Sequence, residues 1–85
     1  MRRSSFECSL DILETVRTPK ILTHIMYKTN VNCSVLKPIL EYLMKKGLIT
    51  TVELSRGISK KHYLISRKGL DVLLAVRKAS ELLQA

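Results

Sequence analysis

The feature that most constrains the fold is a short break, Thr29–Asn32, between two stretches of helical periodicity. Asn30 and Asn32 tolerate turn dihedrals and flank a single apolar residue, Val31. The break therefore predicts a tight turn between two helices, with Val31 in the core and Asn32 capping the second helix. The second helix is expected over about 33–46, with an apolar stripe of Leu36, Ile39, Leu40, Leu43 and Met44.

Two further helical patterns precede this turn. Ser4-Ser5-Phe6-Glu7 has the spacing of a capping box and predicts a helix that runs to about Arg17. Its stripe consists of Phe6, Leu10, Leu13 and Val16, widened by Ile12. Thr18-Pro19 then places a proline where a first helical residue would stand, which predicts that the next helix starts there. The buried side of that helix is expected to be Ile21, Leu22, Ile25 and Met26.

The second half of the chain predicts two strands and a last helix. Residues 48–53 are rich in β-branched side chains, and Tyr63–Ile65 supplies a second short strand. The segment between them, residues 55–61, is polar and basic and predicts the tip of a hairpin. A helical pattern returns from Leu70 to Leu83, and the whole last helix is expected over 67–84.

This order of elements is that of a winged helix-turn-helix domain. The expected fold class is α+β and mainly helical, with a three-helix bundle, a β-hairpin wing and a C-terminal helix. A chain of 85 residues is long enough for one such domain, residues 1–85, and too short for a two-domain enzyme.

The charge of the chain is concentrated in its middle. The formal net charge is +8, and residues 17–68 hold eleven of the 15 Lys and Arg residues but only two acids, Glu41 and Glu53. Such a distribution is expected if the middle of the chain meets a polyanion, so the predicted partner is double-stranded DNA. The alternative is a solvated basic surface that only keeps the protein in solution.

The expected DNA contacts come from three elements. The helix expected over 33–46 offers residues at its start and on the face opposite its apolar stripe. They are Asn32, Cys33, Ser34, Lys37, Glu41 and Lys45. The preceding helix offers Lys20, Tyr27 and Lys28, and the wing offers Arg56, Lys60 and Lys61. Asn and Lys side chains suit adenine and guanine edges in the major groove, whereas wing cations suit phosphates or the minor groove.

Pro38 lies within the helix predicted to read DNA. In a helix that starts at Cys33, this proline removes an internal hydrogen bond and crowds the carbonyl of Ser34, at a cost of about 3 kcal/mol if nothing relaxes. Either the helix starts later or its first turn is kinked, and Lys37 stays exposed in both cases.

The last helix carries two apolar stripes. Leu70, Leu73 and Leu74 form one, and Val72, Val76, Ala79 and Leu83 form the other. The first is expected to cover the core, and the second predicts a homodimer, to which Phe6 and Cys8 of the first helix could add. The alternative is a last helix that curls over its own core and uses both stripes internally.

The sequence contains few features of an enzyme, a metal site or a ligand-binding protein. No nucleophile, base and orienting group recur together, and no phosphate-binding glycine loop is present, so no enzyme, cofactor or small-molecule ligand is predicted. Cys8 and Cys33 do not have the spacing of a metal site, and reduced thiols are favoured over a disulfide between them. Cys33 could instead sense oxidation. Without an apolar run that could span a bilayer, the expected location is the cytoplasm, in association with the nucleoid.

Three segments resemble a known family. Residues 23–32, THIMYKTNVN, resemble the R-I-M-Y-K-A-N-L-S signature of small archaeal winged-helix proteins. Residues 40–49, LEYLMKKGLI, resemble their L-x-x-L-x-x-K-G-L-I, and residues 63–69, YLISRKG, resemble their Y-x-I-T-x-K-G. The likeness extends over about residues 11–74, and Pro38 departs from it.

The resemblance implies a DNA-binding protein. Members of that family are predicted transcriptional regulators or abundant chromatin-type DNA binders, and several dimerise through the last helix. The expected function is sequence-specific DNA binding by a transcriptional regulator. A low-specificity nucleoid protein and a winged helix used as a protein-interaction module stay open as alternatives.

Overall fold

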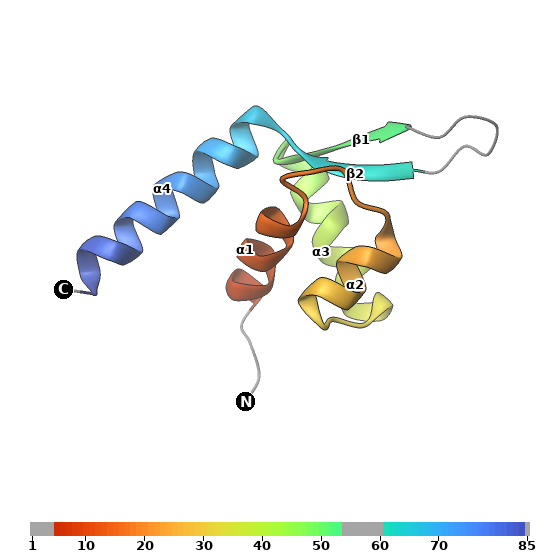
Figure 1. The fold of residues 1–85 in the computed structure, drawn as a ribbon, viewed down its shortest axis with the longest axis horizontal. Coiled ribbons are helices and arrows are strands. Elements are labelled where there is room, and N and C mark those ends of the chain that lie inside the picture. Colours follow the sequence, from red (N-terminus) through yellow and green to blue (C-terminus); the bar gives the residue numbers. More distant parts are fainter. Residues whose placement is uncertain (1–4, 54–60, 85) are drawn as a thin grey trace.

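The computed structural model describes residues 5–53 and 61–84, and over these ranges it contains four helices and one antiparallel hairpin (Figure 1). The elements in chain order are α1 (Ser5–Thr15), α2 (Leu22–Thr29), α3 (Cys33–Lys45), β1 (Ile49–Glu53), β2 (Lys61–Ile65) and α4 (Arg67–Leu83). Helices α1 to α3 form a bundle, and the hairpin and α4 project from it in opposite directions (Figure 1). The molecule is therefore elongated, about 50 × 29 × 20 Å, and the predicted fold class is confirmed.

The core lies where the bundle meets the base of the hairpin. Its buried apolar residues are Cys8, Ile12, Leu13, Val16, Ile25, Val31, Leu36, Leu40, Leu43, Ile49 and Leu73. The stripe predicted for α3 is confirmed, since Leu36, Leu40 and Leu43 are buried and recur at three- and four-residue spacing. Phe6, which was expected to extend the stripe of α1, is exposed instead.

The turn between α2 and α3 has the predicted construction. Asn30 adopts the left-handed conformation, with φ of 56°, and its N–H donates to the carbonyl of Met26. Val31 is buried, and the side-chain oxygen of Asn32 accepts from the Val35 N–H at 3.1 Å. An Asn at each end of the turn thus satisfies helix-terminal backbone groups while Val31 anchors the turn in the core.

The predicted start of α2 at Thr18-Pro19 is wrong. The helix begins at Leu22, and Lys20 forms an isolated antiparallel bridge with Tyr63 of β2. The Lys20 N–H donates to the Tyr63 carbonyl at 3.0 Å, and the Tyr63 N–H donates to the Lys20 carbonyl at 2.7 Å. The fixed φ of Pro19 suits extended chain as well as a first helical turn, so these two backbone bonds decide the conformation.

The second strand of the hairpin is longer than its sequence pattern indicated, because β2 begins at Lys61. β1 and β2 pair in a register that places Ile49 opposite Ile65, Thr51 opposite Tyr63 and Glu53 opposite Lys61. The base of the hairpin is tied to the end of α1 by a bond from the Ile65 N–H to the Val16 carbonyl, and a bond from the Ser66 N–H to the Leu48 carbonyl extends the strand pairing by one residue. Two of the predicted wing contacts, Arg56 and Lys60, lie outside the described residues.

Pro38 lies inside α3, which begins at Cys33. The alternative of a later start is therefore wrong. The carbonyl that loses its helical partner belongs to Ser34, an exposed residue of the first turn, where water can donate in place of the missing N–H.

Helix α4 begins at a side-chain cap and soon leaves the body of the protein. Ser66 Oγ accepts from the Gly69 N–H at 3.0 Å, and Leu73 is buried. Leu74, predicted to share the core stripe, is 48% exposed. The short α1 covers only one side of α4, where Arg77 Nη2 lies 2.8 Å from Glu14 Oε2. From Arg77 to Gln84 every described residue is exposed.

Candidate nucleic-acid interface

One side of α3 carries polar side chains along its whole length. Ser34, Lys37, Glu41 and Lys45 are exposed and follow one another around the face opposite the buried Leu36, Leu40 and Leu43. Because residues three or four apart share a helix face, these four side chains form one strip. We call Ser34, Lys37, Glu41 and Lys45 the polar strip of α3.

The middle of this strip borders the wing. A cleft between α3 and β2 is lined by Lys37, Leu40, Glu41, Met44, Lys61 and Tyr63. Buried Leu40 and half-buried Met44 and Tyr63 supply apolar surface, whereas Lys37, Glu41 and Lys61 are exposed. The Nζ of Lys61 lies 5.6 Å from the centroid of the Tyr63 ring, so the wing cation rests over an aromatic face.

This cleft unites predicted residues that are far apart in the sequence. Lys37 and Glu41 of α3 were predicted for DNA contacts and Lys61 for wing contacts, and all three line the same cleft. Tyr63 was not predicted. The signal that could have identified it is the two-residue alternation of a strand, which puts Tyr63 on the same face as Lys61.

At the start of α3 the side chains bond to each other. Asn32 Oδ1 accepts from the Val35 N–H at 3.1 Å and from Ser34 Oγ at 2.7 Å. Both lone pairs of this oxygen are thus used, whereas a bidentate contact with adenine needs the oxygen to accept and the amide nitrogen to donate. In this conformation only the amide nitrogen of Asn32 is available to DNA. Cys33 beside it is half-buried, and both Cys33 and Cys8 are free thiols.

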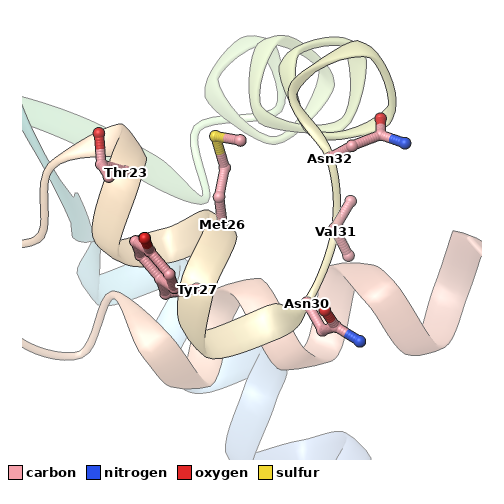
Figure 2. Close-up of a pocket in the computed structure, with 6 residues that line it drawn as sticks. All are labelled: Thr23, Met26, Tyr27, Asn30, Val31 and Asn32. Carbon is pink, nitrogen blue, oxygen red and sulfur yellow. The ribbon is translucent and has the colours of Figure 1, made fainter.

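A second groove lies between α2 and the turn (Figure 2). Its lining residues are Thr23, Met26, Tyr27, Asn30, Val31 and Asn32. Thr23 and Tyr27 lie one turn apart on α2, and Tyr27 is 82% exposed. The groove thereby joins two predicted contacts, Tyr27 and Asn32, to Thr23 and Asn30, which the sequence pattern did not single out. The exposed Lys28 is the last cation of α2.

Lys20 does not belong to α2, contrary to the sequence prediction. It lies in the connector before the helix, where its backbone bridges to Tyr63 and its Nζ donates to Thr18 Oγ1 at 2.6 Å. The tertiary structure therefore places Lys20 beside the wing strand β2, not on the face of α2 with Tyr27.

The family follows from a comparison with known sequences. The sequence profile described as winged helix-turn-helix matches residues 2–84. The chain belongs to the winged helix-turn-helix family. Within its described residues, no helix is long and apolar enough to cross a membrane.

Solved structures share the winged helix-turn-helix fold at low sequence identity. A Streptococcus mutans protein is 23% identical with a TM-score of 0.82, over 95% of this chain and 82% of that one. A PadR-like transcription factor from Bacteroides fragilis is 20% identical with a TM-score of 0.77, over 93% and 84% of the two chains. A DNA-binding protein from Sulfolobus solfataricus is 22% identical with a TM-score of 0.79, over 96% and 83%. No curated protein matches the chain significantly.

Proposed function

We propose that this winged helix-turn-helix protein binds double-stranded DNA sequence-specifically and acts as a transcriptional regulator. In this proposal α3 enters the major groove, and the wing contacts the adjacent backbone or minor groove. The observation that carries it is the cleft in which Lys37 and Glu41 of α3 lie beside Lys61 of the wing. Similar folds in proteins described as PadR-like transcription factors and as a DNA-binding protein support it.

The proposed protein is a binding module and not an enzyme, and it acts without a cofactor or small-molecule ligand in the nucleoid region of the cytoplasm. The basic centre of the chain supports this proposal, because cations that neutralise phosphates supply sequence-independent affinity. The polar strip of α3 adds groups that can read base edges.

We also propose a homodimer built on α4. The second apolar stripe of α4 is accessible, since Val72 is 37% and Leu83 86% exposed, and Ala79 is exposed as well. The last turns of α4 have no packing partner among the described residues, and a short helix without tertiary packing is only marginally stable in water. A second copy would bury this stripe and supply the missing contacts.

The exposure of individual side chains decides which of the expected residues are accessible to a dimer contact. A last helix that uses both stripes internally disagrees with the exposure of Leu83 and Ala79. Cys8, which was expected to add to a dimer interface, is buried in the core of its own chain and is not available. Phe6 is 61% exposed and is therefore accessible to a second copy.

A low-specificity nucleoid protein is the second candidate function. It is favoured by one observation, the commitment of Asn32 Oδ1 to the cap of α3, because this removes a base-reading acceptor from the proposed DNA face. A protein that binds only the DNA backbone does not need that acceptor.

Selection from a random-sequence DNA pool at about 0.15 M salt separates these functions, with the oligomeric state measured in the same buffer. We expect enrichment of a two-fold symmetric motif with half-sites about 34 Å apart. Uniform retention of all sequences would favour the nucleoid protein. No retention would contradict DNA binding and leave the basic surface to a protein partner.

A further inference from the structure

One acid stands in the middle of the surface proposed to meet DNA. Glu41 is exposed on the polar strip of α3, one turn after Lys37 and one turn before Lys45. It also lines the cleft that holds Lys61 of the wing. Among the described residues of the polar strip and the cleft, it is the single acidic side chain.

This carboxylate is not explained by ion pairing on its own helix. Lys37 and Lys45 stand four residues before and after Glu41, a spacing at which helical ion pairs commonly form. Neither pair forms over the part of the chain that the structure describes, where the observed ion pairs join Glu14 to Arg17 and to Arg77. Glu41 therefore presents a solvated carboxylate to whatever occupies the cleft.

A carboxylate on a DNA-binding surface weakens binding unless a base donates a hydrogen bond to it. It repels phosphates, and it cannot donate to the acceptors of guanine or to the O4 of thymine. The exocyclic amino group of cytosine presents a donor in the major groove without a neighbouring acceptor, whereas adenine pairs its amino group with an acceptor, N7. A carboxylate, which accepts hydrogen bonds but cannot donate them, is therefore best matched by the cytosine amino group.

We propose that Glu41 is a specificity-determining residue that accepts a hydrogen bond from the N4 amino group of a cytosine in the major groove. The proposal rests on the proposed DNA binding of α3. Lys37 and Lys61 in the same cleft offset the repulsion between the carboxylate and the phosphates, so the acid discriminates between bases without preventing binding.

The test compares the motif selected by the wild-type protein with those selected by Glu41→Gln and Glu41→Ala. Wild type enriches cytosine at one position of each half-site, and replacing that cytosine weakens binding by about 5- to 100-fold. Glu41→Ala loses this preference because alanine has no acceptor, whereas Glu41→Gln, whose amide both accepts and donates, shifts it toward adenine. Glu81→Gln is the matched control, since it removes the same charge from an exposed position of α4 and retains the wild-type motif.

A modified base isolates the contact itself. In the selected site the cytosine is replaced by pyrimidin-2-one, which lacks the amino group. Wild-type binding weakens by the factor expected for the lost contact, whereas Glu41→Ala binds both sites within about twofold, because the two changes remove the same hydrogen bond. Circular dichroism confirms that both variants keep the fold.

Three results overturn the proposal in distinguishable ways. If Glu41→Ala selects the same cytosine as wild type, Glu41 does not read it and DNA binding by the protein stands. If wild type retains DNA without any base preference, the role of Glu41 is excluded and the nucleoid function is favoured. If wild type retains no DNA, the proposed function itself fails and the role of Glu41 fails with it.

Discussion

Gly69 lies in α4 at a position where any side chain would displace the neighbouring backbone. A Cβ there would clash with the carbonyl oxygen of Leu48 and would lie 2.8 Å from Cγ1 of Ile65. The clash involves backbone, which cannot rotate away as a long side chain can. The glycine therefore allows the first turn of α4 to pack directly on Leu48 and Ile65 at the base of the hairpin.

We predict that Gly69→Ala lowers the free energy of unfolding by about 2 kcal/mol, because overpacking outweighs the helix propensity gained with alanine. Denaturant unfolding followed by circular dichroism measures the change. Ser80→Ala, at an exposed position of the same helix, is the control and should alter stability by less than about 0.5 kcal/mol. A Gly69→Ala variant as stable as wild type would contradict the packing argument.

Lys37 is exposed on α3 and lines the cleft with Glu41, so in the proposed complex we expect this cation to contact a base. We predict that Lys37→Ala weakens binding to the preferred site by about 1–3 kcal/mol and changes the selected motif. Titration against the preferred and a scrambled site measures both effects. Lys78→Ala on α4 is the control and should leave the preference unchanged. Equal weakening on every sequence would favour the nucleoid function.

At the scale of elements, one side chain connects the end of the hairpin to two helices. Ser66 Oγ accepts from the Gly69 N–H at 3.0 Å and donates to the Gly47 carbonyl at 2.6 Å. The first bond caps α4, and the second joins it to the turn that follows α3. Lys68 adds a contact between the same segments, because its Nζ donates to the Lys46 carbonyl at 3.1 Å.

We predict that Ser66→Ala destabilises the protein by about 1 kcal/mol, since it removes the side-chain cap of α4 and the bond to the exposed Gly47 carbonyl. Thermal and denaturant unfolding measure the loss. Ser66→Thr keeps the hydroxyl and should recover most of the stability. If alanine and threonine variants are equally stable, the two bonds of Ser66 contribute nothing to stability.

At the scale of the whole molecule, α4 and the wing extend from opposite sides of the bundle (Figure 1). A dimer formed through α4 would leave both wings and both copies of α3 accessible. If each subunit neutralises on the order of four phosphates, log K against log[salt] should have a slope of roughly −7. A slope near −2 would argue against DNA as the main partner.

We predict that wild type is a dimer at tens of micromolar, with about twice the 9.7 kDa mass of one chain, and that the double variant Ala79→Lys, Leu83→Lys is a monomer. Sedimentation equilibrium measures both masses. The matched control is Leu74→Lys, Leu82→Lys, which places the same charges on exposed leucines outside the stripe and should remain dimeric. A wild-type monomer would exclude the proposed interface.

Much of the fold follows from local pattern. The helical stripes, the turn at Val31 and the cap at Asn32 depend on residues close together in the chain, so their spacing is visible in the sequence. The position of the charge is equally visible and indicates a polyanionic partner. The family assignment confirms the architecture that these local features predict.

The tertiary structure alone decided those features that depend on contacts between residues far apart in the sequence. Lys20 is extended and not helical because the backbone of Tyr63 meets it, and Leu74 is exposed because the short α1 covers only one side of α4. The cleft likewise requires β2 to fold back beside α3, which places Lys61 and Tyr63 next to Lys37 and Glu41. Periodicity specifies which face of a helix is apolar, but which face a neighbour covers depends on the lengths and angles of elements packed in three dimensions.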